Sequence, residues 1–314
     1  MNKSIKALIV FLCFICVLIV VMSCKENSAA TTETLAISEV KDTTPEQPKT
    51  KLTEEFKSYW YAGEAEITSY KLEQARYGEI RDGEAVLVFV TEDFLPDIQV
   101  KADNYSRSNT PVLKLNATKK FNTGIYPYSI MQSTFYPVAN NAHAIKVSAS
   151  IQEWCGQVYT QLNNRAQFEV MSHSYFQGEA DQNFKIEKTW TENELWTKLR
   201  IDPSSLPTGE INIVPSLEFT RLRHKTIKAY TAYANLNSGV YTITYPDLSR
   251  TLKISFTPNF PYEITGWEET TKSGFGASAK TLTTKATKLE SIKSAYWGKN
   301  SNADEGLRKI LKLQ

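Results

Sequence analysis

Alternation of apolar and polar residues predicts β-strands along most of the chain beyond residue 66. The cleanest stretch is 145–152, in which Ile145, Val147, Ala149 and Ile151 alternate with polar residues. Because successive side chains of a strand point to opposite faces, this stretch has one face for a core and one for water. Short turn sequences separate the strand-like stretches, which predicts consecutive antiparallel pairing.

The expected strands are short, rich in β-branched and aromatic residues, and bounded by turn residues. They are residues 67–80, 85–90, 112–118, 145–152, 157–162, 167–176, 211–217, 226–233, 240–245, 251–256 and 262–267. The dipeptide Asp82-Gly83 predicts a hairpin turn between the first two strands. Short strands at even spacing predict a mainly β fold, an antiparallel meander that forms a curved sheet, a half-barrel or a sandwich.

One or two helices are expected to cover this sheet. Thr53 is a candidate N-cap for a short helix over residues 54–60. Thr191 and Glu194 have the spacing of a capping box, and Pro203 ends the helix that follows them. We expect this second helix to lie with its apolar side over a face or an end of the sheet.

An apolar run over residues 7–22 follows a basic start and leads into Val21-Met22-Ser23-Cys24. This order is typical of an export signal with a lipoprotein cleavage box, so we expect residues 1–23 to be removed and Cys24 to carry a lipid such as palmitate. The run is slightly shorter than the roughly 20 residues that cross a bilayer as a helix. An uncleaved signal anchor is the alternative.

Composition divides the rest of the chain into three parts. Residues 24–51 contain no aromatic residue and predict a flexible tether. Residues 52–270 hold the expected β domain, and residues 271–314 form a Lys- and Thr-rich extension with a short basic helix at its end. We expect that helix to dock on the domain, the alternative being a weak membrane contact.

Charge and cysteine content narrow the expected partners. The chain has 36 Lys and Arg against 34 Asp and Glu, a net charge of +2, so no strong field favours a nucleic-acid partner. Two cysteines lie in the signal and Cys24 carries the lipid, so Cys155 has no disulfide partner, and we expect it to be buried. The expected partners are the membrane, through the lipid, and a ligand or protein of the envelope.

Aromatic and basic residues are the candidates for binding. The aromatic candidates are Tyr126, Tyr128, Tyr136, Trp154 and Tyr159. They could line a ligand cavity or a sugar platform, although aromatics at strand spacing are more often core. Arg221, Arg223 and Lys225 have equal parity, so on one strand they would form a basic stripe able to bind phosphates or anionic polysaccharide. The alternative is a solvated edge whose charges discourage pairing with other strands.

No catalytic motif stands out. The histidines His143, His173 and His224 lack metal-ligand spacing, and no phosphate-binding glycine loop or Gly-x-Ser-x-Gly elbow occurs. Cys155, Glu153 and one of the histidines are the candidates for a hydrolase or transferase site, but the sequence identifies no base within reach of the thiol. We therefore assign no catalytic residue, no metal ligand and no cofactor.

Three segments carry a resemblance to a known family: 59–66 (YWYAGEAE), 122–128 (NTGIYPY) and 152–157 (QEWCGQ). In these the chain resembles uncharacterised lipoproteins of Bacteroidota, which are often labelled septum formation inhibitor Maf. That label implies a nucleotide pyrophosphatase of α/β fold with a Ser-x-Ser-Pro-Arg-like loop near its start, which this sequence does not contain. We interpret the label as a misnomer. The predicted meander on an exported lipoprotein also resembles the half-barrel class of lipoprotein carriers.

The sequence predicts an outer-membrane lipoprotein on the periplasmic or surface face. Its β domain is expected to be a non-catalytic module that binds an apolar ligand, a glycan or an envelope partner in a concave cavity lined mainly by Tyr, Phe, Leu and Ile. The alternative is an exported hydrolase or transferase with a site around Cys155, and the pyrophosphatase ranks last.

Replacing the expected lipid acceptor tests the anchor. We expect Cys24→Ser to release the protein from the membrane fraction and to abolish incorporation of a fatty-acid probe, because the thioether attachment point is lost. Fractionation and gel fluorescence after metabolic labelling measure both effects, with Cys155→Ser as the matched control. Labelling that persists in Cys24→Ser would contradict the assignment.

Overall fold

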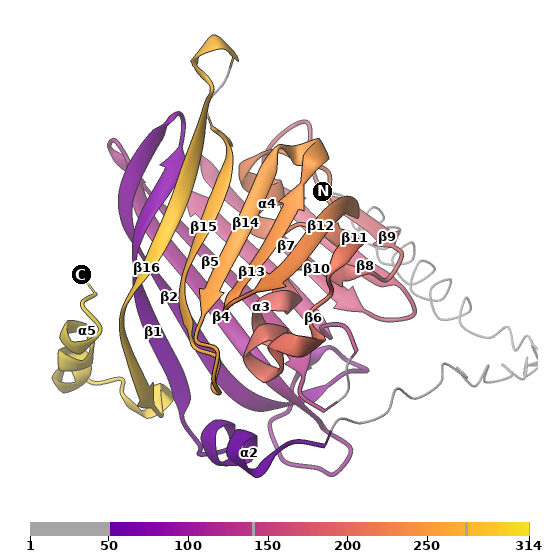
Figure 1. Cartoon of the computed structure of the whole chain (residues 1–314), viewed down its shortest axis with the longest axis vertical. Coiled ribbons are helices and arrows are strands. Elements are labelled where there is room, and N and C mark those ends of the chain that lie inside the picture. Colours follow the sequence, from indigo (N-terminus) through magenta and orange to yellow (C-terminus); the bar gives the residue numbers. More distant parts are fainter. Residues whose placement is uncertain (1–50, 140–141, 274–275, 314) are drawn as a thin grey trace, which may run out of the picture. The chain divides into compact units, whose positions relative to one another are not determined.

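The computed structural model describes residues 51–139, 142–273 and 276–313 (Figure 1). The expected signal and Cys24 lie outside the described residues. The helices are α2 (Glu54–Trp60), α3 (Glu192–Ile201), α4 (Leu217–Leu222) and α5 (Gly306–Ile310), with short 3₁₀ turns between strands such as η2 (Pro246–Leu248) and η4 (Tyr296–Gly298). The strands are β1 (Ala65–Arg76), β2 (Glu79–Leu95), β3 (Val100–Lys101), β4 (Thr110–Thr123), β5 (Tyr126–Pro137), β6 (Lys146–Glu153), β7 (Gly156–Asn164), β8 (Phe168–Ser174), β9 (Gln182–Ile186), β10 (Trp190–Thr191), β11 (Gly209–Val214), β12 (Tyr230–Asn237), β13 (Val240–Tyr245), β14 (Arg250–Phe256), β15 (Ile264–Ser273) and β16 (Lys280–Ser294). Among the described residues, none of the helices has both the length and the apolar character needed to cross a membrane.

All the strands of the described chain belong to one 16-stranded sheet, which confirms the mainly β fold. Its order is β10-β11-β12-β13-β14-β15-β16-β1-β2-β4-β5-β6-β7-β8-β9, and β3 pairs with β2. Neighbours run antiparallel except β10 and β11, which are parallel. The sheet curves so that in Figure 1 β12–β14 lie on the near side, with α3 visible below their ends, and β4–β6 pass behind them. The meander is therefore a single curved sheet.

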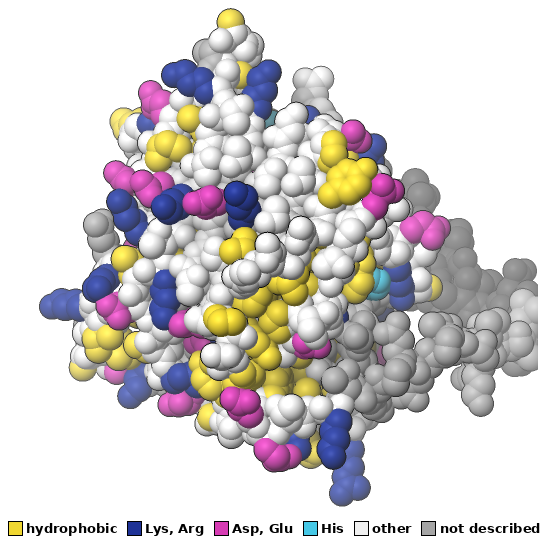
Figure 2. Space-filling view, viewed as in Figure 1, with side chains coloured by type: hydrophobic (Ala, Val, Ile, Leu, Met, Phe, Trp, Pro, Cys, Tyr) yellow, Lys and Arg dark blue, Asp and Glu magenta, His cyan; other side chains and the backbone are white. Residues whose placement is uncertain are grey.

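The interior of the curved sheet is filled by side chains. Leu87 and Leu115 of one half and Ile243 and Ile254 of the other belong to the same buried cluster as Leu199 of α3. Figure 2 shows apolar side chains reaching the surface around α3 on the face in view, with charged side chains around them. Burial of apolar area of this kind is the main stabilising contribution to such a fold.

Helix α3 begins at the predicted capping box. The Thr191 hydroxyl accepts a hydrogen bond from the backbone N–H of Glu194 at 3.3 Å, and the Glu194 carboxylate accepts one from the Thr191 N–H at 3.0 Å. The helix covers the inner face of the sheet as expected, with Leu195 and Leu199 in the core. Its polar side chains, including Lys198 and Arg200, are buried as well, because strands surround the helix on more than one side.

A buried ion pair joins α3 to β1. The guanidinium of Arg200 donates from Nη1 and Nη2 to the two carboxylate oxygens of Glu66 at 2.5 and 2.7 Å, and from Nε to the carbonyl of Pro261 at 2.9 Å. Tyr59 donates its hydroxyl to the same carboxylate at 2.5 Å. Burial alone would raise the pKa of Glu66, but the charge and hydrogen bonds of Arg200 outweigh it and lower that pKa. The carboxylate therefore stays ionised inside the protein.

The hairpin expected at Asp82-Gly83 was wrong. The turn lies at Tyr77 and Gly78, both with positive φ, and β2 runs straight through Asp82 and Gly83. A Cβ on Gly83 would lie 2.3 Å from the carbonyl oxygen of Lys120, so the glycine permits the close approach of β4.

The short helix α2 was predicted correctly, since the Thr53 hydroxyl accepts the N–H of Phe56 at 3.0 Å.

The boundary expected at residue 270 was also wrong. Strand β16 lies within the supposed extension, yet it pairs with β15 on one side and β1 on the other and joins the two halves of the sheet. The terminal helix docks as expected, because Leu311 is buried with Ala65, Ile67 and Val90 on the outer side of the first two strands. The sheet domain therefore extends to the end of the described chain.

Removing one member of the Glu66–Arg200 pair should destabilise the protein strongly. We expect Arg200→Met to lower the free energy of unfolding by about 3–5 kcal/mol, because Glu66 would remain buried without its counter-charge. The double variant Glu66→Leu/Arg200→Met should recover most of the loss. Urea denaturation followed by circular dichroism measures both; an Arg200→Met value within 1 kcal/mol of the wild type would refute the role given to this pair.

Candidate functional site

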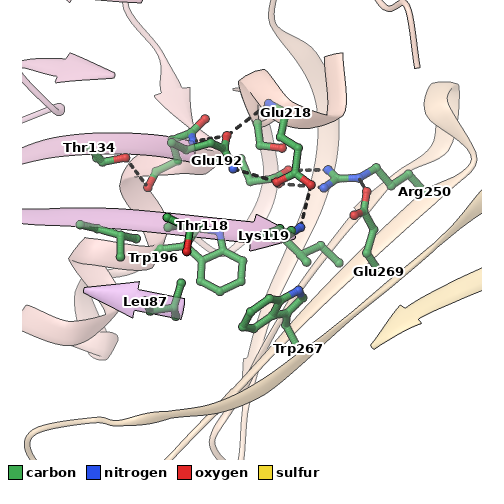
Figure 3. A pocket seen from close by; sticks show the side chains of 16 residues that line it. Leu87, Thr118, Lys119, Thr134, Glu192, Trp196, Glu218, Arg250, Trp267 and Glu269 are labelled. Carbon is green, nitrogen blue, oxygen red and sulfur yellow. Dashed lines mark hydrogen bonds and ion pairs between the residues drawn. The ribbon is translucent and has the colours of Figure 1, made fainter. Parts of the chain in front are cut away.

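A cavity of about 50 Å³ lies inside the curved sheet between α3, α4 and strands of both halves (Figure 3). We call it the central cavity. Its lining residues are Leu87, Leu115, Ala117, Thr118, Lys119, Gln132, Thr134, Glu192, Asn193, Trp196, Ser216, Glu218, Arg250, Leu252, Trp267 and Glu269. The expectation of a lining mainly of Tyr, Phe, Leu and Ile was therefore wrong for this cavity, which combines Trp and Leu with charged and amide groups.

Two tryptophans form the aromatic part of the central cavity. Trp196 of α3 and Trp267 of β15 meet edge to face, with ring centroids 5.3 Å apart and planes at 85°. Trp267 is almost fully buried, whereas Trp196 is only partly buried and is the more accessible of the two. The ammonium of Lys119 lies 5.8 Å from the Trp267 ring centroid, within the range of a cation–π contact.

A polar network forms the opposite part of the central cavity. Glu218 of α4 accepts hydrogen bonds from Lys119 Nζ at 2.7 Å and from the amide of Gln132 at 2.9 Å. The Gln132 oxygen accepts the Asn193 amide at 2.9 Å and the backbone N–H of Glu218 at 3.2 Å. This network ties α3 and α4 to β4 and β5. Each of the two amide nitrogens donates one hydrogen here and has a second to offer.

A second charged group closes the cavity on the side of β14. Arg250 donates to Glu192 of α3 through both terminal nitrogens, one of them at 2.8 Å, and from Nε to Glu269 of β15 at 2.6 Å. Burial alone would raise the pKa of Glu269, but the charges of Arg250 and Lys119 lower it. Each of the cavity's carboxylates is therefore paired with a cation.

The predicted aromatic set does not form one site. Tyr128 is buried and stacks on Phe121 at 4.9 Å, while Tyr136 is buried and accepts a hydrogen bond from Lys198 at 3.4 Å. Tyr126 is partly buried beside Tyr128, with ring centroids 6.0 Å apart. Trp154 and Tyr159 are exposed, Trp154 by 68% at the turn between β6 and β7. Aromatics at strand spacing thus divide between core and surface.

The basic stripe was placed on the wrong kind of element. Residues 217–222 form α4, and a turn follows, so Arg221, Arg223 and Lys225 do not share a strand face. Arg221 is buried with its guanidinium 4.2 Å from the ring centroid of Phe176. Arg223 and Lys225 instead line a second pocket, of about 290 Å³, beyond the end of α4.

Cys155 is exposed at the β6–β7 turn, contrary to the expectation of burial. Glu153 beside it accepts hydrogen bonds from the Cys155 backbone N–H at 2.7 Å and from the Tyr175 hydroxyl at 2.8 Å. The hydrogen bond between the thiol and Glu153, reinforced by the carboxylate charge, raises the pKa of Cys155. A raised pKa reduces the thiolate fraction, which is the opposite of what an activated nucleophile needs.

The histidines each face a separate carboxylate. His143, His173 and His224 lie 2.9, 3.2 and 2.6 Å from oxygens of Glu194, Asp181 and Glu179, respectively. Within residues 51–139, 142–273 and 276–313, no group of three or more His, Cys, Asp or Glu side chains is arranged to hold a metal ion.

Sequence reasoning did not identify the residues of the central cavity. Lys119, Gln132, Glu218 and Trp267 come from four elements that are far apart in the chain, and no short motif joins them. A weak signal existed for Trp196, which is a large aromatic residue in the helix that follows the capping box. The structure shows that most of its neighbours in α3 are buried.

Comparison with known proteins leaves the family open. No protein-family model and no curated protein match the chain. Among solved structures, the chain is similar to a beta-barrel-like protein of a domain of unknown function from Brucella abortus, with 7% identity, a TM-score of 0.37, and coverage of 73% of this chain and 98% of that one. It is also similar to a porin-like protein from Bacteroides uniformis, with 9% identity, a TM-score of 0.21, and coverage of 71% and 95%. The fold class rests on the strand pairing of this chain itself.

Changing Glu153 should make the exposed thiol more reactive. We expect Glu153→Gln to lower the pKa of Cys155, because the carboxylate charge is lost and a neutral amide oxygen is a weaker acceptor for the thiol. The rate of iodoacetamide labelling at pH 8, followed by mass spectrometry, should therefore rise. Glu169→Gln on the neighbouring strand is the control and should leave the rate unchanged. A rate that falls in Glu153→Gln would contradict this account.

Proposed function

We propose that this protein is an envelope lipoprotein whose β domain is a non-catalytic glycan-binding module. The observation that carries the proposal is the mixed lining of the central cavity, where two indole rings and leucines face amide, hydroxyl and charged groups. Sugars have the same division, with C–H faces that pack on aromatic rings and an edge of hydroxyl or amide groups.

The dimensions of the central cavity favour an N-acetylated sugar. A cavity of about 50 Å³ is too small for a sugar ring but suits a substituent such as an acetamido group. Its methyl would contact Trp196 and neighbouring leucines, and its carbonyl would accept from the spare amide hydrogens of Gln132 and Asn193. The sugar ring would then lie against Trp196, which is the more exposed indole.

The filled interior speaks against the apolar ligand considered from the sequence. Pockets that bury drug-sized ligands measure roughly 300–1,000 Å³ and are mostly apolar. The central cavity is several times smaller, and charged pairs such as Lys119–Glu218 and Arg250–Glu269 stand at its wall. An acyl chain placed there would either separate the paired charges or take away their contact with water, and each costs several kcal/mol.

The address of the module is proposed from the N-terminal sequence. A lipid on Cys24 would anchor the protein in the outer membrane, and residues 24–51 would serve as the tether. On either the periplasmic or the surface face, a tethered module meets envelope glycans at high local concentration.

Titration with defined oligosaccharides tests the proposal. We expect the N-acetylglucosamine trimer to change the intrinsic tryptophan fluorescence saturably, and the glucose trimer to do so much less, because it lacks the acetamido group. Trp196→Leu should weaken binding of the acetylated trimer at least tenfold, or about 1.4 kcal/mol.

Trp297→Leu is the matched control, since Trp297 is 54% exposed in η4, away from the cavity. It should bind like the wild type. Equal affinity of the wild type for both trimers, or equal losses in both tryptophan variants, would refute the N-acetylated ligand.

A further inference from the structure

A second pocket, the basic pocket, lies beyond the end of α4 and has a volume of about 290 Å³. Four turns and strand ends meet there: the end of β1, the turn after α4, η2 and the end of β15. Its charged lining comprises Arg76, Arg223, Lys225 and Lys272 against the single acid Asp247. The histidine of this lining, His224, is held by Glu179 of the β8–β9 loop at 2.6 Å. Positive charge therefore exceeds negative charge at the basic pocket.

Arg223 lacks a counter-charge of its own. It is partly buried, and none of the described residues forms an ion pair or a hydrogen bond with its guanidinium. The charge of Arg223 interacts with the carboxylate of Glu269, but that carboxylate already accepts a hydrogen bond from Arg250 at 2.6 Å. Burial lowers the pKa of Arg223, and the charges of Arg76 and Arg250 lower it further although Glu269 opposes them. A partly buried guanidinium of this kind is electrostatically unfavourable while it has no partner.

Arg76 is held rigidly at the same pocket. It is 5% exposed, and its terminal nitrogens donate to the carbonyl of Leu222 at 2.7 Å and to the hydroxyls of Tyr77 and Tyr128 at 3.0 Å each. These acceptors are neutral, so they satisfy hydrogens without neutralising the charge. The buried Nε of Arg76 has no acceptor among the described residues.

Two other deeply buried arginines show what the basic pocket lacks. Arg200 is paired with Glu66, and Arg250 is paired with Glu192 and Glu269. The buried Arg221 lies over the ring of Phe176 instead and belongs to neither group. At the basic pocket two guanidiniums and two ammonium groups converge without such pairing among the described residues, which is the arrangement that proteins use for phosphate oxygens.

We propose that the basic pocket binds a phosphate monoester, with Arg223 and Arg76 as its main contacts and Lys225 and Lys272 at the rim. A doubly charged phosphate matches the excess of positive charge better than a carboxylate, and its oxygens can accept from two guanidiniums at once. The phosphate can belong to a soluble sugar phosphate or to a lipid headgroup. This site is separate from the central cavity and does not depend on the glycan proposal.

Calorimetry with the purified full chain tests the site. We expect glucose 6-phosphate to bind the wild type in 0.1 M NaCl and to raise its Tm, whereas glucose 1-sulfate of single charge should bind at least fivefold more weakly. Arg223→Gln should weaken binding of glucose 6-phosphate at least tenfold. Arg107→Gln, which removes an exposed arginine from another loop, should bind within twofold of the wild type.

Two further arms keep the outcome decisive. Lys225→Gln changes an exposed rim residue, so it should fold normally and weaken binding about threefold even if Arg223→Gln folds poorly. Vesicles of phosphatidylcholine with phosphatidic acid test the lipid source, and co-sedimentation that requires Arg223 without binding of glucose 6-phosphate would assign the phosphate to a headgroup. Failure of both probes to bind, or equal binding by Arg223→Gln and Arg107→Gln, would overturn the proposal. Trp196→Leu should leave phosphate binding unchanged.

Discussion

Buried ion pairs hold α3 inside the curved sheet, and the central cavity depends on them. Arg200 is bonded to Glu66 of β1, and Glu192 at the opposite end of the helix is bonded to Arg250 of β14. Moving such charges out of water costs several kcal/mol per ion. Each ion can therefore be buried only together with its partner of opposite charge. The helix therefore has one orientation, and that orientation places Trp196 at the wall of the central cavity.

The two pockets differ in whether the chain itself provides carboxylates for their cationic side chains. In the central cavity, Lys119 has Glu218, and Arg250 has two carboxylates. In the basic pocket, Arg76 has only neutral acceptors and Arg223 has no bonded partner among the described residues. A cavity whose charges are neutralised suits a neutral polar ligand, and a pocket with an excess of cations suits an anion.

Local signals predicted the elements better than their surroundings. The alternation over 145–152 and the capping box at Thr191 are confirmed, because both depend on residues a few positions apart. Asp82-Gly83 failed as a turn signal since the close approach of β4 also requires glycine. The parity argument for Arg223 failed because a short helix interrupts the strands there.

By itself the sequence determined the fold class, the start of two helices and the alternation that gives each strand a buried face. It also determined an N-terminal pattern whose function as an anchor stays a prediction. Only the tertiary structure decided which polar residues meet: Glu66 and Arg200 are 134 positions apart, and Glu192 and Arg250 are 58 apart. Propensities act over a few residues, whereas such pairs form only when the sheet curves around the helix and excludes water from both partners.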